Sequence, residues 1–304
     1  MKQNYFGVIP PIVTPVDSQE QVDEDGLRAL IEHSIRRGLH GIFVAGSNGE
    51  AMALTQAQRN RAIQVSVDQV AGRVPLFCGI MDSSTRRVIE NLKALEDLGG
   101  TCAVITPVFY DRHTSQAETI RHFEAISRAS SIDLILYNIP SFTNVKLTPD
   151  TVLQIAQMDH VVGYKDSTGS LQDFLQVLYA LEGKPFSCMI GVTPLAVPGL
   201  LLGADGFVPV LSPLFPELFV QTYEAAKAGD LARAKALDKI VQDSSRILSM
   251  TKNATAAAKF AISQLGYSHK RVLMPQDAIA PDEEQAILRK IDQVNQAFAA
   301  LQAQ

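Results

Sequence analysis

The chain has no tryptophan, only three cysteines among its 304 residues, and no long apolar segment. Cys78, Cys102 and Cys188 are odd in number and lack the paired spacing of zinc sites and redox motifs. Each lies in a strand-like apolar run, so we expect buried thiols in a reducing cytoplasm. No stretch approaches the ~20 apolar residues of a membrane span, and the N-terminus lacks a signal-peptide core. We therefore expect a cytoplasmic protein without a membrane span or a metal site.

Basic clusters are missing as well. The formal net charge is −5, and the sequence contains neither a run of basic residues nor basic residues interleaved with aromatic ones. Nucleic acid is therefore not an expected partner, since binding to phosphates requires concentrated positive charge. The hydrophobic fraction of 46% against 19% charged residues is typical of a well-buried globular enzyme and excludes a disordered or fibrous chain.

Short apolar runs alternate with amphipathic segments over most of the chain. Each run is bounded by Gly, Pro or Ser, as expected for a strand that is buried on both faces. We expect strands at residues 7–14, 41–45, 76–80, 102–106, 133–137, 161–165, 187–191 and 206–211.

Apolar positions at three- and four-residue spacing predict helices between these strands. The expected helices cover residues 25–37, 55–70, 84–97, 115–129, 149–157, 170–181, 194–202 and 215–228. Eight strand–helix alternations predict an α/β fold of the (β/α)8 TIM barrel type. An open doubly wound sheet is the alternative, but the count and the missing Gly-rich fingerprint after the first strand disfavour it.

The strand signal stops after Gly229-Asp230. Three Ala- and Lys-rich helices are expected at residues 231–249, 254–265 and 281–301, as a C-terminal three-helix appendage packed on the barrel. The chain is thus predicted to divide into a catalytic barrel, residues 1–229, and a helical region, residues 230–304. No Gly/Ser or Pro linker separates the two, so independent motion of the appendage is not expected.

A tyrosine and a lysine end two successive strands. Tyr137 closes the fifth expected strand and Lys165 closes the sixth, so in a parallel barrel both side chains would point into the same mouth. A lysine amine forms Schiff bases with carbonyl substrates, and a neighbouring phenol can transfer the protons that this chemistry needs. The alternative is a structural lysine paired with a carboxylate beside a core tyrosine.

Other strand ends add candidate residues. The second strand runs into Gly46-Ser47-Asn48-Gly49-Glu50, where a tight turn can hold a carboxylate with backbone N–H groups and a hydroxyl. The fourth strand ends near Phe109 and Tyr110 at the rim, and the eighth strand offers the backbone carbonyl of Val208. An ordinary βα turn and packed or interface aromatics are the alternative interpretations.

Four motifs carry a resemblance to a known family. They are Gly46-Ser47-Asn48-Gly49-Glu50, Tyr137-Asn138-Ile139-Pro140, Gly163-Tyr164-Lys165-Asp166-Ser167 and Gly203-Ala204-Asp205-Gly206. In order and spacing they resemble the dihydrodipicolinate synthase/N-acetylneuraminate lyase family over essentially the whole chain. The resemblance implies a class I aldolase barrel, usually a homotetramer built as a dimer of dimers, that forms a Schiff base with pyruvate or another 2-oxo acid.

The resemblance also implies roles for individual residues. Lys165 resembles the Schiff-base lysine and Tyr137 the proton-transfer tyrosine. Ser47 and Asn48, with Gly49, resemble the carboxylate site, where Ser47 also relays protons, and the Val208 carbonyl faces the adduct. Tyr110 resembles the tyrosine that completes the relay across a subunit interface, although Phe109 is the alternative because this segment is one residue longer than in the synthases. Two further substrate contacts are expected, from Ser167 and Thr193.

Departures from the family pattern narrow the range of expected substrates. Phe142 occupies the position of an arginine that grips the aldehyde carboxylate in the synthases, and phenylalanine cannot make that bidentate contact. The stretch Gly191-Val192-Thr193-Pro194 lacks the carboxylate with which sialic-acid lyases bind a polyol. The motifs more closely resemble 4-hydroxy-2-oxoglutarate and 2-keto-3-deoxy-sugar-acid aldolases.

We therefore expect a carbon–carbon lyase that joins or separates pyruvate and an aldehyde, without a metal or organic cofactor because the iminium itself accepts the electrons. A 2-keto-3-deoxy-acid dehydratase on the same machinery is an alternative. Two further alternatives are dihydrodipicolinate synthase, which Phe142 disfavours, and a non-catalytic sensor on the same barrel.

Overall fold

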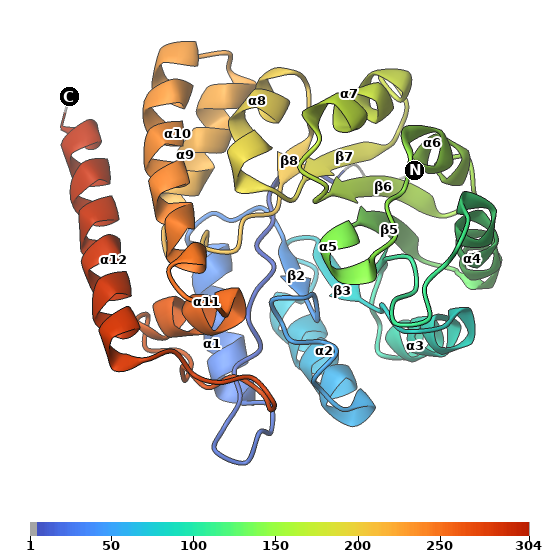
Figure 1. Cartoon of the computed structure of the whole chain (residues 1–304), viewed down its shortest axis with the longest axis horizontal. Coiled ribbons are helices and arrows are strands. Elements are labelled where there is room, and N and C mark those ends of the chain that lie inside the picture. Colours follow the sequence, from blue (N-terminus) through green and yellow to red (C-terminus); the bar gives the residue numbers. More distant parts are fainter. Residues whose placement is uncertain (1–4, 304) are drawn as a thin grey trace.

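Eight parallel strands form one curled sheet with helices around its outside (Figure 1). The structure is a computed structural model and describes residues 5–303. The strand order is β1-β8-β7-β6-β5-β4-β3-β2. Their bounds are β1 Gly7–Val8, β2 Ile42–Val44, β3 Leu76–Gly79, β4 Cys102–Ile105, β5 Asp133–Asn138, β6 Val161–Asp166, β7 Ser187–Ile190 and β8 Gly206–Phe207.

A short parallel bridge closes the sheet into a barrel. Pro11 pairs with Phe43 of β2, just beyond the end of β1. Two backbone hydrogen bonds accompany this bridge: the Phe43 N–H donates to the Pro10 carbonyl over 2.9 Å, and the Ile12 N–H donates to the Phe43 carbonyl over 3.0 Å. The predicted (β/α)8 barrel is therefore confirmed.

The helices begin at the polar residues that the sequence places before them. Thr55, expected as a start signal, lies at an N-cap, and so do Ser84, Ser115 and Ser170, with which three of the expected helices began. Each has an extended backbone and accepts a hydrogen bond from the first turn. The helices are α1 Glu24–Arg36, α2 Gln56–Val70, α3 Thr85–Asp97, α4 Gln116–Ala129, α5 Pro140–Thr143, α6 Pro149–Ile155, α7 Leu171–Ala180, α8 Ala196–Leu201, α9 Pro216–Lys227, α10 Leu231–Ser245, α11 Ala254–Ser263 and α12 Pro281–Gln302, with short 3-10 turns η1 Thr193–Leu195 and η2 Arg246–Ser249.

Prolines shorten two of the expected strands. The first was expected over residues 7–14 but ends at Val8, ahead of Pro10 and Pro11. The last was expected over residues 206–211 but ends at Phe207, ahead of Pro209. Proline has no N–H to donate to a neighbouring strand, so a regular ladder cannot continue through these positions. The short helix α5 was not expected, because it occupies only four residues after β5.

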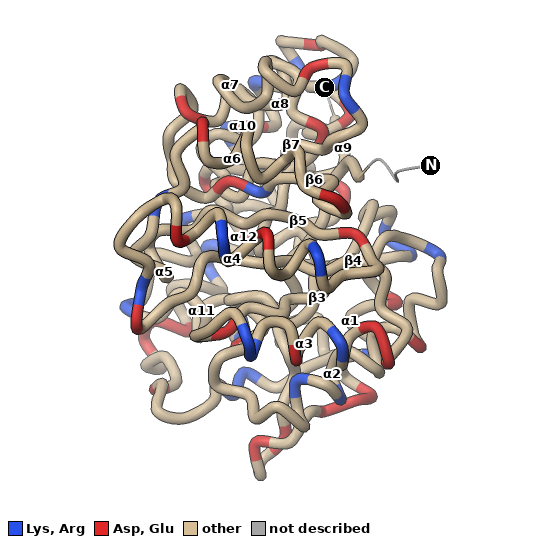
Figure 2. The backbone as a smooth tube through the Cα atoms, turned by 90° about the vertical axis from the view of Figure 1, so that its right-hand side faces the viewer, with Lys and Arg blue, Asp and Glu red and all other residues tan. Residues whose placement is uncertain are grey.

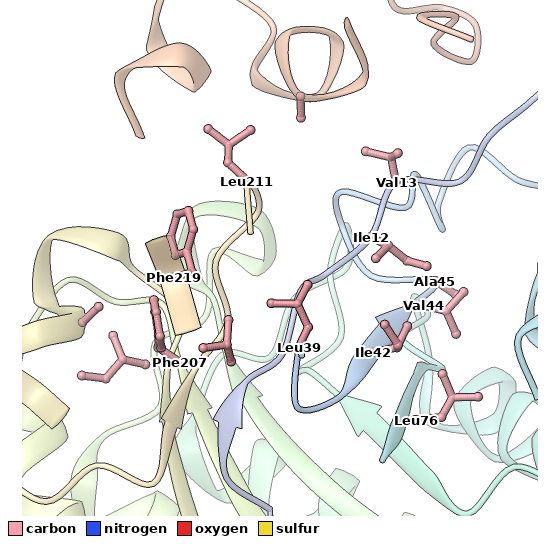
Figure 3. Close-up of a cluster of buried hydrophobic side chains, with 14 of the residues drawn as sticks. Ile12, Val13, Leu39, Ile42, Val44, Ala45, Leu76, Phe207, Leu211 and Phe219 are labelled. Atoms are coloured by element: carbon pink, nitrogen blue, oxygen red, sulfur yellow. The ribbon is translucent and has the colours of Figure 1, made fainter. Parts of the chain in front are cut away.

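Successive strand residues pack in two different cores. Phe43, Phe77 and Val104 belong to a cluster inside the barrel, together with residues of β5, β6 and β7. Ile42 and Val44, which flank Phe43, pack in the larger cluster between the barrel and its helices, where Figure 3 shows them near Leu76. Both faces of each strand are thus buried, and this explains why the strands read as continuous apolar runs.

The C-terminal helices pack against one side of the barrel. Figure 1 shows α10 beside α9, with α12 on the outer side of α10 and α11 below. Apolar residues of α11 and α12, such as Phe260 and Ile287, join the same core cluster as the barrel helices. The three helices were expected here, whereas a domain boundary at residue 229 stays a prediction, because one apolar core includes residues from both parts.

Charged residues of both signs alternate along the chain. Figure 2 shows basic and acidic segments interspersed over the helices. Among the described residues, no helix is long and apolar enough to span a membrane.

Candidate active site

Lys165 and Tyr137 lie side by side inside the barrel. They are register partners on the adjacent strands β6 and β5. The Lys165 Nζ lies 3.9 Å from the centroid of the Tyr137 ring and 4.9 Å from that of Phe43 on β2. Both side chains are buried, with 5% exposure for Lys165 and 4% for Tyr137. The structure therefore brings together the two residues on which the sequence prediction of Schiff-base chemistry depends.

A β-bulge in β6 directs Lys165 inward. Leu134 of β5 pairs with Val161, but the next residue, Ile135, pairs with Gly163, so Val162 is an extra residue in β6. Val162 and Lys165 are three positions apart, and in a regular strand they would face opposite sides of the sheet. Yet Val162 belongs to the interior cluster and Lys165 contacts two rings of that cluster. Bulges re-aim side chains in this way, and periodicity alone did not predict this one.

Burial shifts the acid–base properties of both groups. Removal from water lowers the pKa of the Lys165 amine to about 7, because the low-dielectric surroundings disfavour the charged form. The same effect raises the pKa of the Tyr137 phenol. The Ser167 hydroxyl donates a hydrogen bond to the Tyr137 oxygen over 3.4 Å. Near neutral pH, an amine that is substantially in its neutral, nucleophilic form thus lies beside a protonated phenol.

A polar network fixes the ends of β5 and β6. The Tyr164 hydroxyl donates to the Asp166 carboxylate and accepts a 3.2 Å bond from the Asn138 amide. Asn138 also bonds the backbone N–H and carbonyl of Leu147, and Asp166 accepts two bonds from Thr168. These residues adjoin Tyr137 and Lys165 in sequence, so their bonds hold the two strand ends rigid. In the sequence, these polar residues are direct neighbours of Tyr137 and Lys165, and this position was the signal from which their supporting role could have been predicted.

The glycine loop after β2 needs both of its glycines. A Cβ added to Gly46 would lie 2.9 Å from the Phe43 ring, and one added to Gly49 would lie 3.2 Å from the Thr14 hydroxyl. Thr14 donates a 2.7 Å hydrogen bond to the Gly49 carbonyl. Ser47 and Asn48 are partly exposed between these packed glycines. The loop is therefore held against the ring that also borders Lys165.

A cavity of about 530 Å³ opens at the carboxyl ends of the strands. Of the predicted site residues, Ser47 and Phe142 line it, and so does Phe109, the alternative to Tyr110. The nearly buried Lys165 and Tyr137 do not line it, although Ile139, two residues after Tyr137, does. Its full described lining consists of Ser47, Glu50, Ala51, Met52, Ala53, Met81, Thr106, Phe109, Ile139, Phe142, Thr143, Thr255, Met274, Pro275 and Gln276.

Three further predicted residues lie outside the cavity lining, as do Asn48, Gly49 and Ser167. Tyr110 is 98% exposed, with a left-handed φ of 70°, and it does not line the cavity. Val208 is buried in the interior cluster that includes Tyr137. Thr193 lies in η1, and its carbonyl accepts a hydrogen bond from Gln242 of α10. Within this chain, the structure thus groups Val208 with Tyr137 in the interior cluster, whereas Tyr110 and Thr193 lie outside both this cluster and the cavity lining.

Gly191, at the end of β7, is a site residue that the sequence reasoning missed. An added Cβ would lie 2.1 Å from the Ser167 hydroxyl and 3.0 Å from Lys165 Cε. Only glycine therefore allows β7 to approach the lysine this closely. Within residues 5–303, no group of three or more His, Cys, Asp or Glu is arranged to hold a metal ion.

Comparison with known proteins places this site in a family. The model of the dihydrodipicolinate synthetase family matches residues 4–294. The chain belongs to the dihydrodipicolinate synthetase family. It is 33% identical over 287 residues to a 4-hydroxy-tetrahydrodipicolinate synthase of Methanopyrus kandleri. The aligned segment covers 94% of this chain and 95% of that protein. The recognition made from the four motifs is thereby confirmed, and so is a pyruvate-dependent lyase of the class I aldolase type.

Solved structures of the family share the whole fold. Dihydrodipicolinate synthase from Bacteroides thetaiotaomicron superposes with a TM-score of 0.89 at 32% identity, covering 95% of this chain and 98% of that one. YagE, a prophage protein of the dihydrodipicolinic acid synthase family from E. coli K12 in complex with pyruvate, gives a TM-score of 0.91 at 26% identity, covering 96% and 99%. A closer relation to the sugar-acid aldolases stays a prediction.

Proposed function

We propose that this enzyme forms a Schiff base between Lys165 and pyruvate and joins it to, or releases it from, an aldehyde. One observation carries the proposal: the desolvated Lys165 amine, with its pKa lowered to about 7, lies 3.9 Å from the ring centroid of Tyr137. Neutral amines attack ketones, and a phenol within reach supplies general acid–base catalysis. The pyruvate complex of the related prophage protein supports the choice of 2-oxo acid.

The proposed reaction divides into steps that named residues perform. Lys165 attacks the ketone, water leaves, and the resulting iminium accepts the electron pair released when the C3–C4 bond breaks. Burial keeps the phenol of Tyr137 protonated, so in condensation it donates its proton to the developing 4-alkoxide. In cleavage, the 4-hydroxyl group returns this proton to the Tyr137 oxygen as the C3–C4 bond breaks. The loop of Ser47, Asn48 and Gly49, with the Val208 carbonyl, holds and orients the adduct.

The rate of imine formation should depend on pH with an inflection near 7. Only the neutral amine reacts, and a pKa of about 7 leaves roughly half of the Lys165 amine neutral at pH 7. The rate should therefore fall as the pH drops below about 7 and reach a plateau above about 8. Borohydride quenching of the pyruvate adduct at successive pH values measures this. A rate that keeps rising up to about pH 10 would indicate an ordinary, solvated lysine and contradict the prediction.

The named relatives favour a second candidate, 4-hydroxy-tetrahydrodipicolinate synthase. Phe142 opposes it, because its ring lines the cavity at the position where the resemblance expects an arginine. Charge-assisted bonds to a carboxylate are worth roughly 1.5–3 kcal/mol each, and phenylalanine makes none. A panel of 2-oxo acids scored for pyruvate release separates an aldolase from this synthase, and release of water without pyruvate would identify the dehydratase alternative.

We predict that condensation of pyruvate with aspartate semialdehyde is poor. The carboxylate of that aldehyde would face the Phe142 ring, so the chain should fail to rescue a strain that lacks dihydrodipicolinate synthase. Phe142→Arg should raise this activity. The side chain is 65% exposed, so the substitution should be tolerated by the fold. Robust synthase kinetics in the unchanged enzyme would overturn the prediction.

The assembly and location belong to the same proposal. We infer a cytoplasmic homotetramer, which the family resemblance and three free, buried cysteines support. In such an assembly the exposed Tyr110 would approach the site of a neighbouring subunit. Sedimentation equilibrium of the intact protein tests the tetramer, and a monomer at micromolar concentration would exclude it.

A further inference from the structure

The walls of the cavity indicate which aldehyde it accepts. This inference rests on the proposed function and concerns the second substrate. Six lining residues are large and apolar: Met52, Met81, Phe109, Ile139, Phe142 and Met274. Unbranched methionines fill irregular space and adapt to different ligands, and aromatic rings favour flat apolar partners.

No positive charge faces this space. Among residues 5–303, the cavity lining includes no Lys, Arg or His, and Glu50 is its single charged member. The Glu50 carboxylate is paired with Lys259 and its side chain is 2% exposed. A carboxylate or phosphate on the aldehyde would lose its hydration here without gaining a cation, and this costs far more than burying an apolar group.

We propose that the aldehyde partner is uncharged and has an apolar body, either an aryl ring or an alkyl chain. A cavity of about 530 Å³ accommodates such a body next to the pyruvate adduct. The hydroxyl groups of Thr106 and Thr255 and the amide of Gln276 also line the cavity, and they can bond the aldehyde oxygen without requiring a charged substituent.

Two matched pairs of aldehydes test this proposal on the intact enzyme at saturating pyruvate. Benzaldehyde is compared with 2-carboxybenzaldehyde, and butanal with succinic semialdehyde, by the rate of pyruvate consumption. The neutral member of each pair should have a kcat/KM at least about tenfold higher. Phe142→Arg should narrow or reverse the preference, whereas Phe6→Arg, at another exposed phenylalanine, should not.

Equal or better use of the charged aldehydes by the unchanged enzyme would overturn the proposal. So would the absence of turnover with both neutral aldehydes while borohydride still traps pyruvate on Lys165. In that second case the Schiff-base function survives, whereas a failure of trapping would reject the proposed function itself.

A separate observation concerns how the glycine loop is held. Glu50, the last residue of the loop, forms an ion pair with Lys259 of α11, and the two side chains are only 2% and 0% exposed. The other Glu50 oxygen accepts a 2.8 Å hydrogen bond from the backbone N–H of Leu273. Two segments of the C-terminal region therefore converge on one carboxylate of the candidate substrate loop.

The backbone of the loop depends on this carboxylate. Glu50 has a left-handed φ of 53°, which costs free energy for a residue with a Cβ. Its N–H donates to the Ser47 carbonyl over 3.1 Å, so the position of Glu50 fixes that of Ser47. Leu54, four residues further on, packs with Leu273 in a small apolar cluster. The C-terminal region and the loop are thus joined by charge, backbone and apolar contacts.

We propose that Glu50 and Lys259 are positioning residues that hold Ser47 and Asn48 ready for the carboxylate of the 2-oxo acid. The geometry supports this role in the proposed function, because the strained end of the loop is tied to α11 instead of facing solvent. Isolated buried ion pairs contribute little net stability compared with apolar replacements. Loss of the pair should therefore disturb substrate binding more than folding.

The test is the double variant Glu50→Gln with Lys259→Met, which leaves no unpaired charge. Half-saturation of borohydride trapping by pyruvate should require about tenfold more pyruvate, while the trapping rate at saturation and the Tm change little. The single variant Glu50→Gln keeps an acceptor for the Leu273 N–H, and it should also raise the pyruvate concentration needed for half-saturation. The exposed pair Arg86–Glu90 on α3, replaced by Met and Gln, is the control and should leave half-saturation unchanged.

Unchanged half-saturation in a folded double variant would overturn the positioning role. Failure of both Glu50 variants to fold would overturn it as well, since the pair would then serve the fold and not the loop. Complete loss of trapping at saturating pyruvate would assign Glu50 or Lys259 to the chemistry itself and would also contradict the proposal.

Discussion

Replacing Lys165 by alanine is expected to abolish the covalent adduct that borohydride traps with pyruvate. The unchanged enzyme should gain the mass of one reduced pyruvate per chain, and peptide mapping should place it on Lys165. In the proposed mechanism its amine is the nucleophile, and burial leaves a large fraction of it neutral near pH 7. The fold should persist, because the substitution removes a desolvated amine and leaves an interior cluster of apolar side chains in place. Intact-mass spectrometry and thermal unfolding measure the two effects.

Lys259 provides an internal comparison for this result. It is also fully buried, but the Glu50 carboxylate holds it as an ion pair, so it should not react. Lys184→Ala, at an exposed lysine, should keep the adduct. An adduct found on Lys259 or on an exposed lysine would reject Lys165 as the nucleophile, and the absence of any adduct would reject Schiff-base chemistry altogether.

Tyr137→Phe is expected to lower kcat by roughly the 10²–10⁴-fold typical of a positioned acid–base group, while pyruvate still binds. The phenol is the hydroxyl group whose ring lies against the amine, and Ser167 orients it. Because phenylalanine keeps that ring in the interior cluster, the fold and the environment of Lys165 should change little. Steady-state kinetics and borohydride trapping on the same preparation separate the effect on turnover from the effect on imine formation.

Tyr179→Phe is the matched control, since this tyrosine is half exposed on α7 and belongs neither to the cavity lining nor to the interior cluster. Its kinetics should equal those of the unchanged enzyme. A near-normal kcat in Tyr137→Phe would show that another group transfers the proton, and Ser47, the lining residue with a hydroxyl on the substrate loop, would be the next to replace.

Local sequence patterns predicted the barrel and the closeness of Tyr137 and Lys165 for a physical reason. Strands that are buried on both faces are continuous apolar runs, and parallel strands end at the same rim of a barrel. An inward residue at a strand end can then face a substrate, and this is the role that we propose for Tyr137 and Lys165. The strand bounds were less predictable, because Pro10 and Pro209 interrupt the ladders before the apolar runs end.

Long-range features were not predictable in the same way. The pairing of Glu50 with Lys259 joins residues more than two hundred positions apart, and no local spacing connects them. The contribution of Met274, Pro275 and Gln276 to the cavity wall likewise depends on how the last helices pack against the barrel. The sequence shows Gly191 as a glycine at a strand end. Why glycine is needed there, namely the close approach of Ser167 and Lys165, could be learned only from the structure.

Between Val161 and Lys165, β6 contains one residue more than its register with β5 requires. Deleting Val162 would leave β6 in regular register with β5 and Lys165 still opposite Tyr137, so the amine would stay inside the barrel. An insertion in the same segment would instead need a second bulge, and without one it would turn Lys165 toward the helices. Variants of this protein should therefore keep the inward lysine after loss of one residue between Val161 and Lys165, but not after gain of one.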